Sequence, residues 1–139
     1  MTGLTYDSGA LIAAERDERR MWLIHRKALK TGIRPVVPAA VLTEVYRSGR
    51  QARLAHLLTG CEIEALEATS ARTAGVLLGR CAINPGAVDA SVAEGALRRG
   101  DSVVTGNAEH IQALATGANR KLDVIRILRL GHYPKDTGR

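Results

Sequence analysis

Apolar residues occur along this chain in two alternating patterns. Short apolar runs separate longer segments in which apolar residues recur every three or four positions. The short runs are typical of buried strands, and the longer segments are typical of amphipathic helices. Strands are therefore predicted at residues 4–6, 34–38, 61–66, 102–106 and 124–128.

The segments between these strands carry the helical pattern. The first helix is expected to run unbroken from an apolar start into a charged amphipathic stretch that ends at Gly32, and Gly49 is expected to end the second. A Thr or Ser is expected to cap the fourth helix. Strands that alternate with helices predict an α/β fold with a central parallel β-sheet flanked by helices. The predicted helices cover residues 8–32, 39–49, 51–60, 69–82, 87–100 and 107–117.

Length and composition narrow the class of protein. The 139 residues contain no repeat or linker, so we expect one domain over residues 1–131 and a short C-terminal tail at 132–139. Phe is absent, so the core must be aliphatic. Cys61 and Cys81 lack CxxC spacing, which favours reduced core thiols in a cytoplasmic protein. Without a signal peptide or an apolar run long enough to cross a bilayer, no membrane association is expected.

The formal net charge is +6 and the sequence pI is about 9.9. This excess favours an anionic partner such as nucleic acid, a membrane surface or an acidic protein. It is equally typical of a basic protein that is merely soluble, so the charge alone does not choose between these classes.

Four polar residues stand where strands end or helices begin. Asp7 and Asn107 follow two predicted strands, Asp89 lies near the start of a helix, and Glu44 lies within one. Each position has a structural alternative. Asp7 and Asn107 would serve as helix caps, and the charge of Asp89 would interact favourably with the helix dipole. The side chain of Glu44 would simply reach solvent. In open parallel sheets, however, ligands bind at the carboxyl ends of strands. If the carboxylates converge there, each pair at ~5 Å repels by roughly 3 kcal/mol at an effective dielectric near 20. A divalent cation relieves that repulsion, and oxygen ligands suit Mg²⁺ or Mn²⁺.

Other chemistries lack their motifs. The chain has no GxxxxGKS or GxxxxGKT loop, no GxGxxG after a strand and no GxSxG elbow. Ser8 has no evident histidine partner. The histidines show no HxxxH pairing, so a zinc site is not expected; they are His25, His56, His110 and His132.

Four segments in order resemble the successive motifs of PIN-domain ribonucleases, and most closely the VapC toxins of bacterial toxin–antitoxin pairs. The segments are YDSGALIA at 6–13, VPAAVLTEVYR at 37–47, AVDASVA at 87–93 and VVTGNAEHI at 103–111. The resemblance covers nearly the whole chain. It implies a PIN-like domain with an acidic pocket at the carboxyl edge of its sheet and Mg²⁺-dependent cleavage of RNA, with Mn²⁺ as a possible substitute.

The resemblance also implies roles for individual residues. Asp7, Glu44 and Asp89 match the first three acids of the pattern, and the fourth acidic position falls on Asn107. Thr105 matches the small hydroxyl residue before that position. Asp7 and Asp89 would hold the metal, Glu44 would complete the site or orient the attacking water, and Asn107 and Thr105 would position water or phosphate. Asn107 in place of an acid leaves open how many metals bind.

A toxin of this kind implies an RNA substrate, a VapB-like antitoxin as partner and a homodimer contact. An amphipathic antitoxin helix is expected on the two helices at 39–58, against Val41, Val45, Leu54, Leu57 and Leu58. The alternative is a catalytically weak RNA-binding or protein-interaction module on a PIN scaffold, which Asn107 favours. A phosphoacceptor receiver domain would need paired acids after the first strand and a lysine after a late one, and the sequence has neither.

Overall fold

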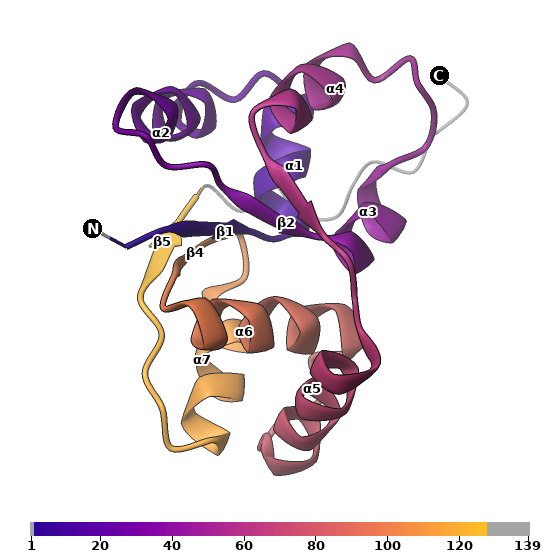
Figure 1. The fold of residues 1–139 in the computed structure, drawn as a ribbon, viewed down its shortest axis with the longest axis vertical. Coiled ribbons are helices and arrows are strands. Elements are labelled where there is room, and N and C mark those ends of the chain that lie inside the picture. Colours follow the sequence, from indigo (N-terminus) through magenta and orange to yellow (C-terminus); the bar gives the residue numbers. More distant parts are fainter. Residues whose placement is uncertain (1, 128–139) are drawn as a thin grey trace.

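A five-stranded, wholly parallel β-sheet forms the middle layer of the molecule (Figure 1). The computed structural model describes residues 2–127. The strands are β1 (Leu4–Tyr6), β2 (Val36–Pro38), β3 (Glu62–Glu64), β4 (Ser102–Thr105) and β5 (Val124–Arg126). They lie in the order β3-β2-β1-β4-β5, with β1 at the centre. All five predicted strands are present, although most are shorter than predicted, and the predicted parallel α/β fold is confirmed.

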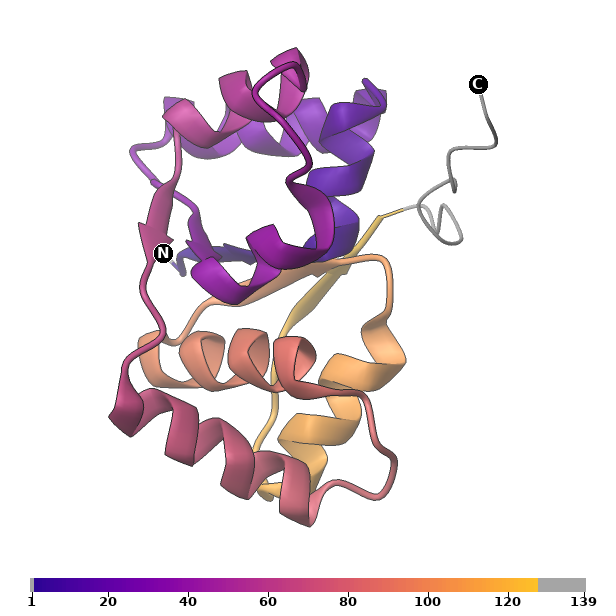
Figure 2. The same cartoon turned by 90° about the vertical axis from the view of Figure 1, so that its right-hand side faces the viewer.

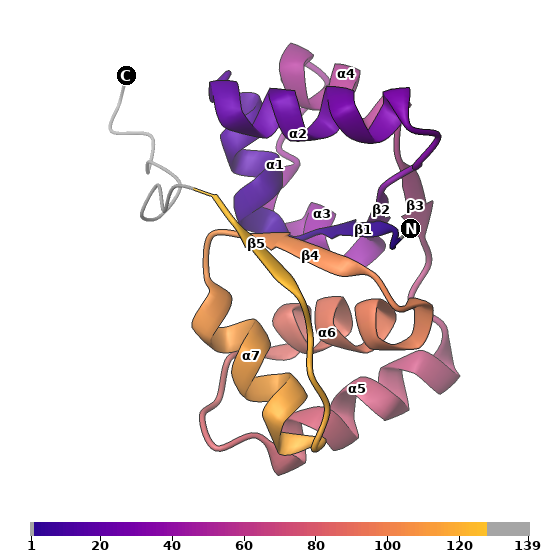
Figure 3. The ribbon, with the colours of Figure 1, turned by 90° about the vertical axis from the view of Figure 1, so that its left-hand side faces the viewer.

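Helices cover both faces of this sheet. Their bounds are Ser8–Glu15 (α1), Arg19–Lys30 (α2), Ala39–Val45 (α3), Ala52–Thr59 (α4), Ala68–Arg80 (α5), Ala87–Arg99 (α6) and Ala108–Gly117 (α7). Helices α1, α2 and α4 lie on one face, and α5, α6 and α7 lie on the other (Figures 1 and 3). Helix α3 contacts both α1 and α6 (Figure 2).

The strand order explains why the helices divide in this way. Parallel strands joined by a helix almost always follow a right-handed crossover. The chain moves outward from β1 to β2 and β3, which places the first helices on one face, and then returns past β1 to β4 and β5. Reversing the direction of travel places the later helices on the opposite face.

The prediction of one continuous helix over 8–32 was wrong. Helix α1 ends at Glu15, and Asp17 adopts a left-handed conformation with φ of 59°. The amide of Glu18 donates to the carbonyl of Ala13 at 2.9 Å, which is the long-range bond of a Schellman turn. The Glu18 side chain then accepts from the amide of Met21 at 2.7 Å and caps α2. The helical pattern continues through the break because both helices bury one face.

Helix α3 also ends earlier than predicted, at Val45 rather than at Gly49. The side chain of Gln51 closes the turn that follows. Its Oε1 accepts from the amides of Arg47 and Ser48 at 2.6 and 3.1 Å, and its Nε2 donates to the carbonyl of Val45 at 3.0 Å. These bonds satisfy backbone groups that a longer helix would have used, so the helix stops four residues before the glycine.

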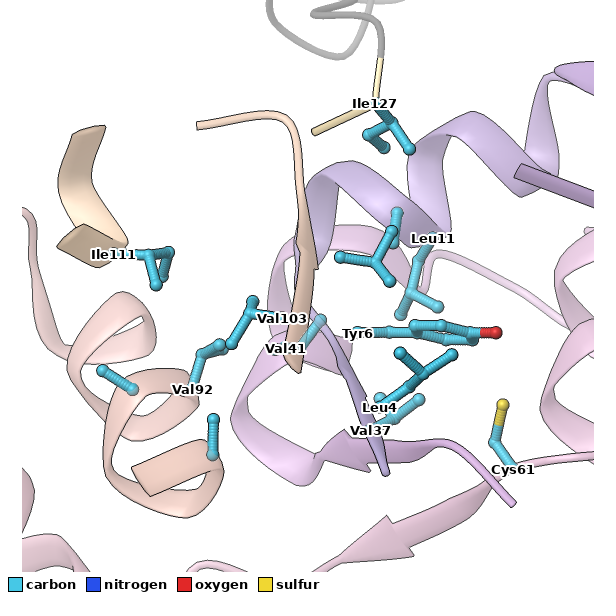
Figure 4. Packing of buried hydrophobic residues seen from close by; sticks show 14 of the residues in the cluster. Leu4, Tyr6, Leu11, Val37, Val41, Cys61, Val92, Val103, Ile111 and Ile127 are labelled. Atoms are coloured by element: carbon cyan, nitrogen blue, oxygen red, sulfur yellow. The ribbon is translucent and has the colours of Figure 1, made fainter. Parts of the chain in front are cut away.

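The core is largely aliphatic, as the composition predicted, with the buried Tyr6 as an aromatic exception, and it has two parts, one on each face of the sheet (Figure 4). Tyr6 and Leu11 pack on one face, and Val92 and Ile111 on the other. Cys61 is buried and Cys81 half-buried, and both are free thiols, in agreement with prediction. Within residues 2–127, no helix is long and apolar enough to cross a membrane.

Two further predictions were wrong. Helix α5 begins after Glu67 with no side-chain cap, so neither Thr69 nor Ser70 caps it. The proposed docking residues belong largely to the core, because the exposed fraction is at most 1% for Val41, Val45, Leu54 and Leu57. Only Leu58 among them is half-buried. The predicted tail at 132–139 lies outside the described residues.

Candidate active site at the carboxyl edge of the sheet

The two central strands end beside each other, and the chain leaves them in opposite directions. From β1 it enters α1 on one face, and from β4 it enters α7 on the other. Such a switch point opens a crevice at the strand ends, where ligands bind in open α/β sheets. The two turns approach closely, because a Cβ added to Gly9 would lie 2.9 Å from the backbone nitrogen of Gly106.

Asp7 lies in this crevice and is only 4% exposed. Its Oδ1 accepts from the amide of Ala10 at 3.3 Å, so it caps α1, and its Oδ2 accepts from the Thr105 hydroxyl. Burial raises the pKa of Asp7 to about 6, and the charge of Asp89 adds to the rise, while the bonds from Thr105 and Ala10 oppose it. The capping role and the site role therefore belong to the same carboxylate.

Asp89 stands in the first turn of α6 and faces the same crevice. Its Oδ2 lies 3.0 Å from Nδ1 of His110 on α7. Burial raises the pKa of Asp89, His110 lowers it, and the charge of Glu44 raises it. Since Asp89 also acts on Asp7, Asp89 is coupled electrostatically both to Asp7 and to Glu44, although the three acids come from three different helices or their caps.

Glu44 completes this set from α3. Its side chain is exposed, and its Oε1 accepts from the hydroxyl of Ser8, the residue after Asp7. Close by, the guanidinium of Arg47 donates to the carbonyl oxygens of Thr43, Glu44 and Tyr46. The Arg47 guanidinium therefore satisfies carbonyl groups at the C-terminal end of α3, beside Glu44.

Thr105 and Asn107 join the site through the turn after β4. The amide of Asn107 donates to the Thr105 hydroxyl at 2.9 Å, and that hydroxyl donates to Asp7. Although Asn107 precedes α7, its side chain makes no capping bond. Its Nδ2 instead lies 2.9 Å from Nδ1 of His110. Asn107 therefore does not act as a side-chain cap of α7, which was the structural alternative for this position.

Sequence reasoning missed His110, which contacts both Asp89 and Asn107. We considered histidines only in HxxxH pairs, and His110 forms none. The available signal was its spacing, because residues three apart in a helix share a face, and Asn107 stands three positions before His110. Ser8 was not expected to belong to the site, whereas its hydroxyl donates to Glu44.

The donor set fits a hard divalent cation. Carboxylate, amide and hydroxyl oxygens are the ligands that Mg²⁺ and Mn²⁺ prefer, and the mutual repulsion of the three acids is what a cation would relieve. Among residues 2–127, no three His, Cys, Asp or Glu side chains already surround a common point closely enough to hold an ion. The residues therefore suit the metal by chemical type and charge, while coordination requires the side chains to move closer together.

Comparison with known proteins identifies solved structures that share this fold. No family model and no curated protein matches the sequence. Among solved structures, 21 chains match. One is in the crystal structure of VapBC2 from Rickettsia felis bound to a DNA fragment from their promoter, with a TM-score of 0.67, 16% identity and coverage of 89% of this chain and 98% of that one. Another is in DNA-bound VapBC from Salmonella typhimurium, with a TM-score of 0.66, 18% identity and coverage of 91% and 98%.

These matches extend over nearly the whole of each matched chain. The protein has the fold of VapC-type PIN domains, and the resemblance drawn from its four motifs is confirmed at the level of the fold. Sequence identities of 16% and 18% support a shared fold and do not establish a shared activity. The activity must be inferred from the site.

Proposed function

We propose that this protein is a metal-dependent ribonuclease and the toxin of a toxin–antitoxin pair. The observation that carries the proposal is the convergence of Asp7, Glu44 and Asp89 at the switch point of the sheet, where the charge of Asp89 raises the pKa of Asp7 and the charge of Glu44 raises the pKa of Asp89. Structural ion pairs are the usual explanation of clustered acids. Among residues 2–127, however, His110 is the one basic side chain that pairs with any of these three acids. A group of carboxylates whose negative charge is so little balanced by basic side chains is typical of a cation site.

Each residue would have a distinct task. Asp7 and Asp89 would hold Mg²⁺ or Mn²⁺, and the bound ion would activate water and stabilise charge on the phosphate. Glu44 is exposed and is held by Ser8, so it is placed to accept a proton from water entering the site. Thr105 fixes the orientation of the Asp7 carboxylate. The net charge of +6 would attract the RNA backbone in a salt-dependent manner.

Cleavage of RNA by the purified full-length protein tests this proposal. The substrates are labelled tRNA, rRNA and mRNA fragments, incubated with Mg²⁺, with Mn²⁺ or with a chelator. We expect cleavage with either metal, none with the chelator and none by Asp89→Asn. Glu109→Gln is the matched control, because Glu109 is an exposed acid in the first turn of α7, and it should cleave at the wild-type rate.

Two results would overturn the proposal. One is intact RNA under every condition, and the other is equal cleavage by Asp89→Asn, which would indicate a contaminating nuclease. If the protein binds RNA tightly yet cleaves none, the second candidate holds, namely an RNA-binding module on a PIN scaffold. Asn107 in place of a fourth acid is the observation that favours that candidate.

The partner follows from the same proposal. The matched structures are complexes of VapBC with DNA, so we propose a VapB-like antitoxin for this chain. The buried leucines of α4 cannot receive it, but a groove of about 680 Å³ lies between α2 and α4. Trp22 and the half-exposed Leu23 provide its apolar lining, and three arginines surround them: Arg19, Arg26 and Arg53. These features suit an amphipathic helix that carries acidic residues.

Two exposed leucines allow a matched test of this docking site. Leu23 in the groove is 49% exposed, and Leu66 outside it is 48% exposed. After co-expression with the product of the adjacent small gene, Leu23→Glu should lose the partner and Leu66→Glu should retain it. Equal retention by both variants would place the partner elsewhere. Sedimentation of the free protein tests the expected homodimer.

A further inference from the structure

His110 occupies an unusual position for a histidine with no assigned role. Its side chain is 37% exposed, and its Nδ1 points toward the acidic pocket rather than into solvent or the core. Nδ1 lies 3.0 Å from Oδ2 of Asp89 and 2.9 Å from Nδ2 of Asn107. One ring nitrogen is therefore shared between two side chains that belong to the proposed metal site.

These two contacts cannot both be hydrogen bonds as they stand. If Nδ1 carries a proton, it donates to Asp89 and cannot accept from the amide of Asn107. If Nδ1 is bare, it accepts from Asn107 but faces the Asp89 carboxylate with a lone pair. Two arrangements remove the conflict. A half-turn of the Asn107 amide lets its oxygen accept from Nδ1–H beside the Asp89 carboxylate, and a cation lets the carboxylate and the bare ring nitrogen direct their lone pairs at the same ion. Rotating the Asn107 amide by half a turn presents its oxygen as a third donor.

The separations also suit a shared ion. Two donor atoms that occupy neighbouring corners of an octahedron, each ~2.1 Å from the metal, lie ~3.0 Å apart. The distances from Nδ1 to Asp89 and to Asn107 are 3.0 and 2.9 Å. The distance to Asp89 equals the edge of such an octahedron as well as the length of an ordinary hydrogen bond, and the distance to Asn107 does so for the amide oxygen once the amide is turned. His110 therefore lies within reach of a cation that Asp89 also binds.

We infer that His110 supplies a nitrogen ligand to the divalent cation of this site and shifts the preference of the site from Mg²⁺ toward Mn²⁺ and Co²⁺. The inference rests on the proposed function, because it takes Asp89 as a metal ligand. Mg²⁺ binds oxygen and rarely gives up water for imidazole, whereas first-row transition metals bind imidazole readily and with rising affinity from Mn²⁺ to Co²⁺. An otherwise all-oxygen site with one histidine should favour the latter ions.

A different role for His110 predicts different behaviour. A histidine that only orients Asp89 would donate Nδ1–H to the carboxylate and remain outside the coordination sphere. His110→Asn separates the two roles. The asparagine amide still donates to Asp89 from nearly the same place, whereas the only ligand it can offer the metal is an oxygen, so the nitrogen ligand and the preference for Co²⁺ that it confers are lost.

The experiment measures binding of the metal alone to full-length protein without a histidine tag. Calorimetry gives the affinities for Mg²⁺, Mn²⁺ and Co²⁺, and pulsed electron paramagnetic resonance of bound Mn²⁺ detects a directly coordinated imidazole nitrogen. The variants are His110→Asn, His110→Asp and Asp89→Asn. His56→Asn is the control for adventitious binding, because His56 is an exposed histidine on α4.

We expect an imidazole nitrogen signal in the wild type and in His56→Asn, and its loss in His110→Asn and His110→Asp. Affinity for Co²⁺ should fall in His110→Asn by about tenfold or more, with a smaller change for Mg²⁺. His110→Asp should reverse the order of preference in favour of Mg²⁺. Circular dichroism confirms that each variant is folded.

If the wild type binds cations through Asp89 but gives no nitrogen signal, or if His110→Asn keeps the wild-type ratio of Co²⁺ to Mg²⁺ affinity, His110 is not a ligand and the proposed nuclease function still stands. If the wild type binds none of the three ions, both the inference and the metal-dependent function fail.

Discussion

Replacing Asp7 by asparagine should stabilise the metal-free protein at neutral and alkaline pH. Asp7 is 4% exposed, and burial raises its pKa to about 6 from an ordinary value of 3.8. The folded protein therefore holds the proton of Asp7 more tightly than the unfolded chain does. Stability from this group is complete below pH 3.8 and is lost as the pH rises toward 6, so at pH 8 the ionised carboxylate opposes folding.

The magnitude follows from the pKa difference. The 2.2 pH units between 3.8 and about 6 correspond to ~3 kcal/mol at pH 8, at 1.36 kcal/mol per unit. Asparagine avoids this cost, but it has one carbonyl oxygen in place of two carboxylate oxygens. It therefore cannot accept both hydrogen bonds that Asp7 accepts, from the Thr105 hydroxyl and from the Ala10 amide. Losing one buried hydrogen bond costs ~1 kcal/mol. The expected net gain is ~2 kcal/mol at pH 8, or several degrees in melting temperature.

Thermal unfolding in a chelator measures this gain. At pH 4.5 the wild-type penalty falls to ~1 kcal/mol by the same linkage relation, so Asp7→Asn and wild type should melt at nearly the same temperature. Asp101→Asn is the control, because Asp101 is also buried but pairs with Arg99 at 2.9 Å, and its loss should destabilise the protein. A variant Asp7→Asn that melts below wild type at pH 8, with a difference independent of pH, would refute the assignment of a destabilising charge to Asp7.

Three further substitutions test other parts of the structure. Asn107→Asp adds a charged ligand and should tighten Mg²⁺ and Mn²⁺ binding in calorimetry; unchanged affinity would place Asn107 outside the metal site. Gly9→Ala forces a Cβ to 2.9 Å from the Gly106 nitrogen and should cost ~1–3 kcal/mol of stability in denaturant titration, so a neutral result would show that the two turns move apart freely. Leu54→Glu places a charge at a 1% exposed position and should destabilise by at least ~3 kcal/mol, whereas a stable variant would contradict its place in the core.

The sequence alone predicted the parallel sheet and several of the polar residues that meet at its carboxyl edge. Short apolar strands alternating with helices allow few arrangements other than a parallel sheet, because each crossover must return the chain to the same edge. Asp7 directly follows β1, Thr105 is the last residue of β4 and Asn107 stands two positions after it, so their meeting at the carboxyl edge was predictable from local order. Asp89 and Glu44 were singled out by their positions near the start of a helix and within one, and the roles expected of them came from the resemblance to a family.

Only the tertiary structure decided where several helices end. The break near Asp17 leaves Glu15 free to accept from the amide of Leu54 at 3.0 Å, which caps α4 from a helix far away in sequence. Gln51 ends α3 in a similar way, through bonds to residues that precede it. Hydrophobic periodicity records which face of a segment is buried, and that face continues across both breaks, so the pattern gave no sign of them.

The role of His110 depended on the tertiary structure for the same physical reason. Its contact with Asp89 joins α7 to α6 across 21 positions of the chain, and a lone histidine on a helix has no sequence pattern that reveals such a neighbour. The pairing of Ser8 with Glu44 spans 36 positions and is equally hidden. Local order fixed which polar groups stand at the ends of strands, whereas the packing of α3, α6 and α7 around those ends decided which other side chains reach them.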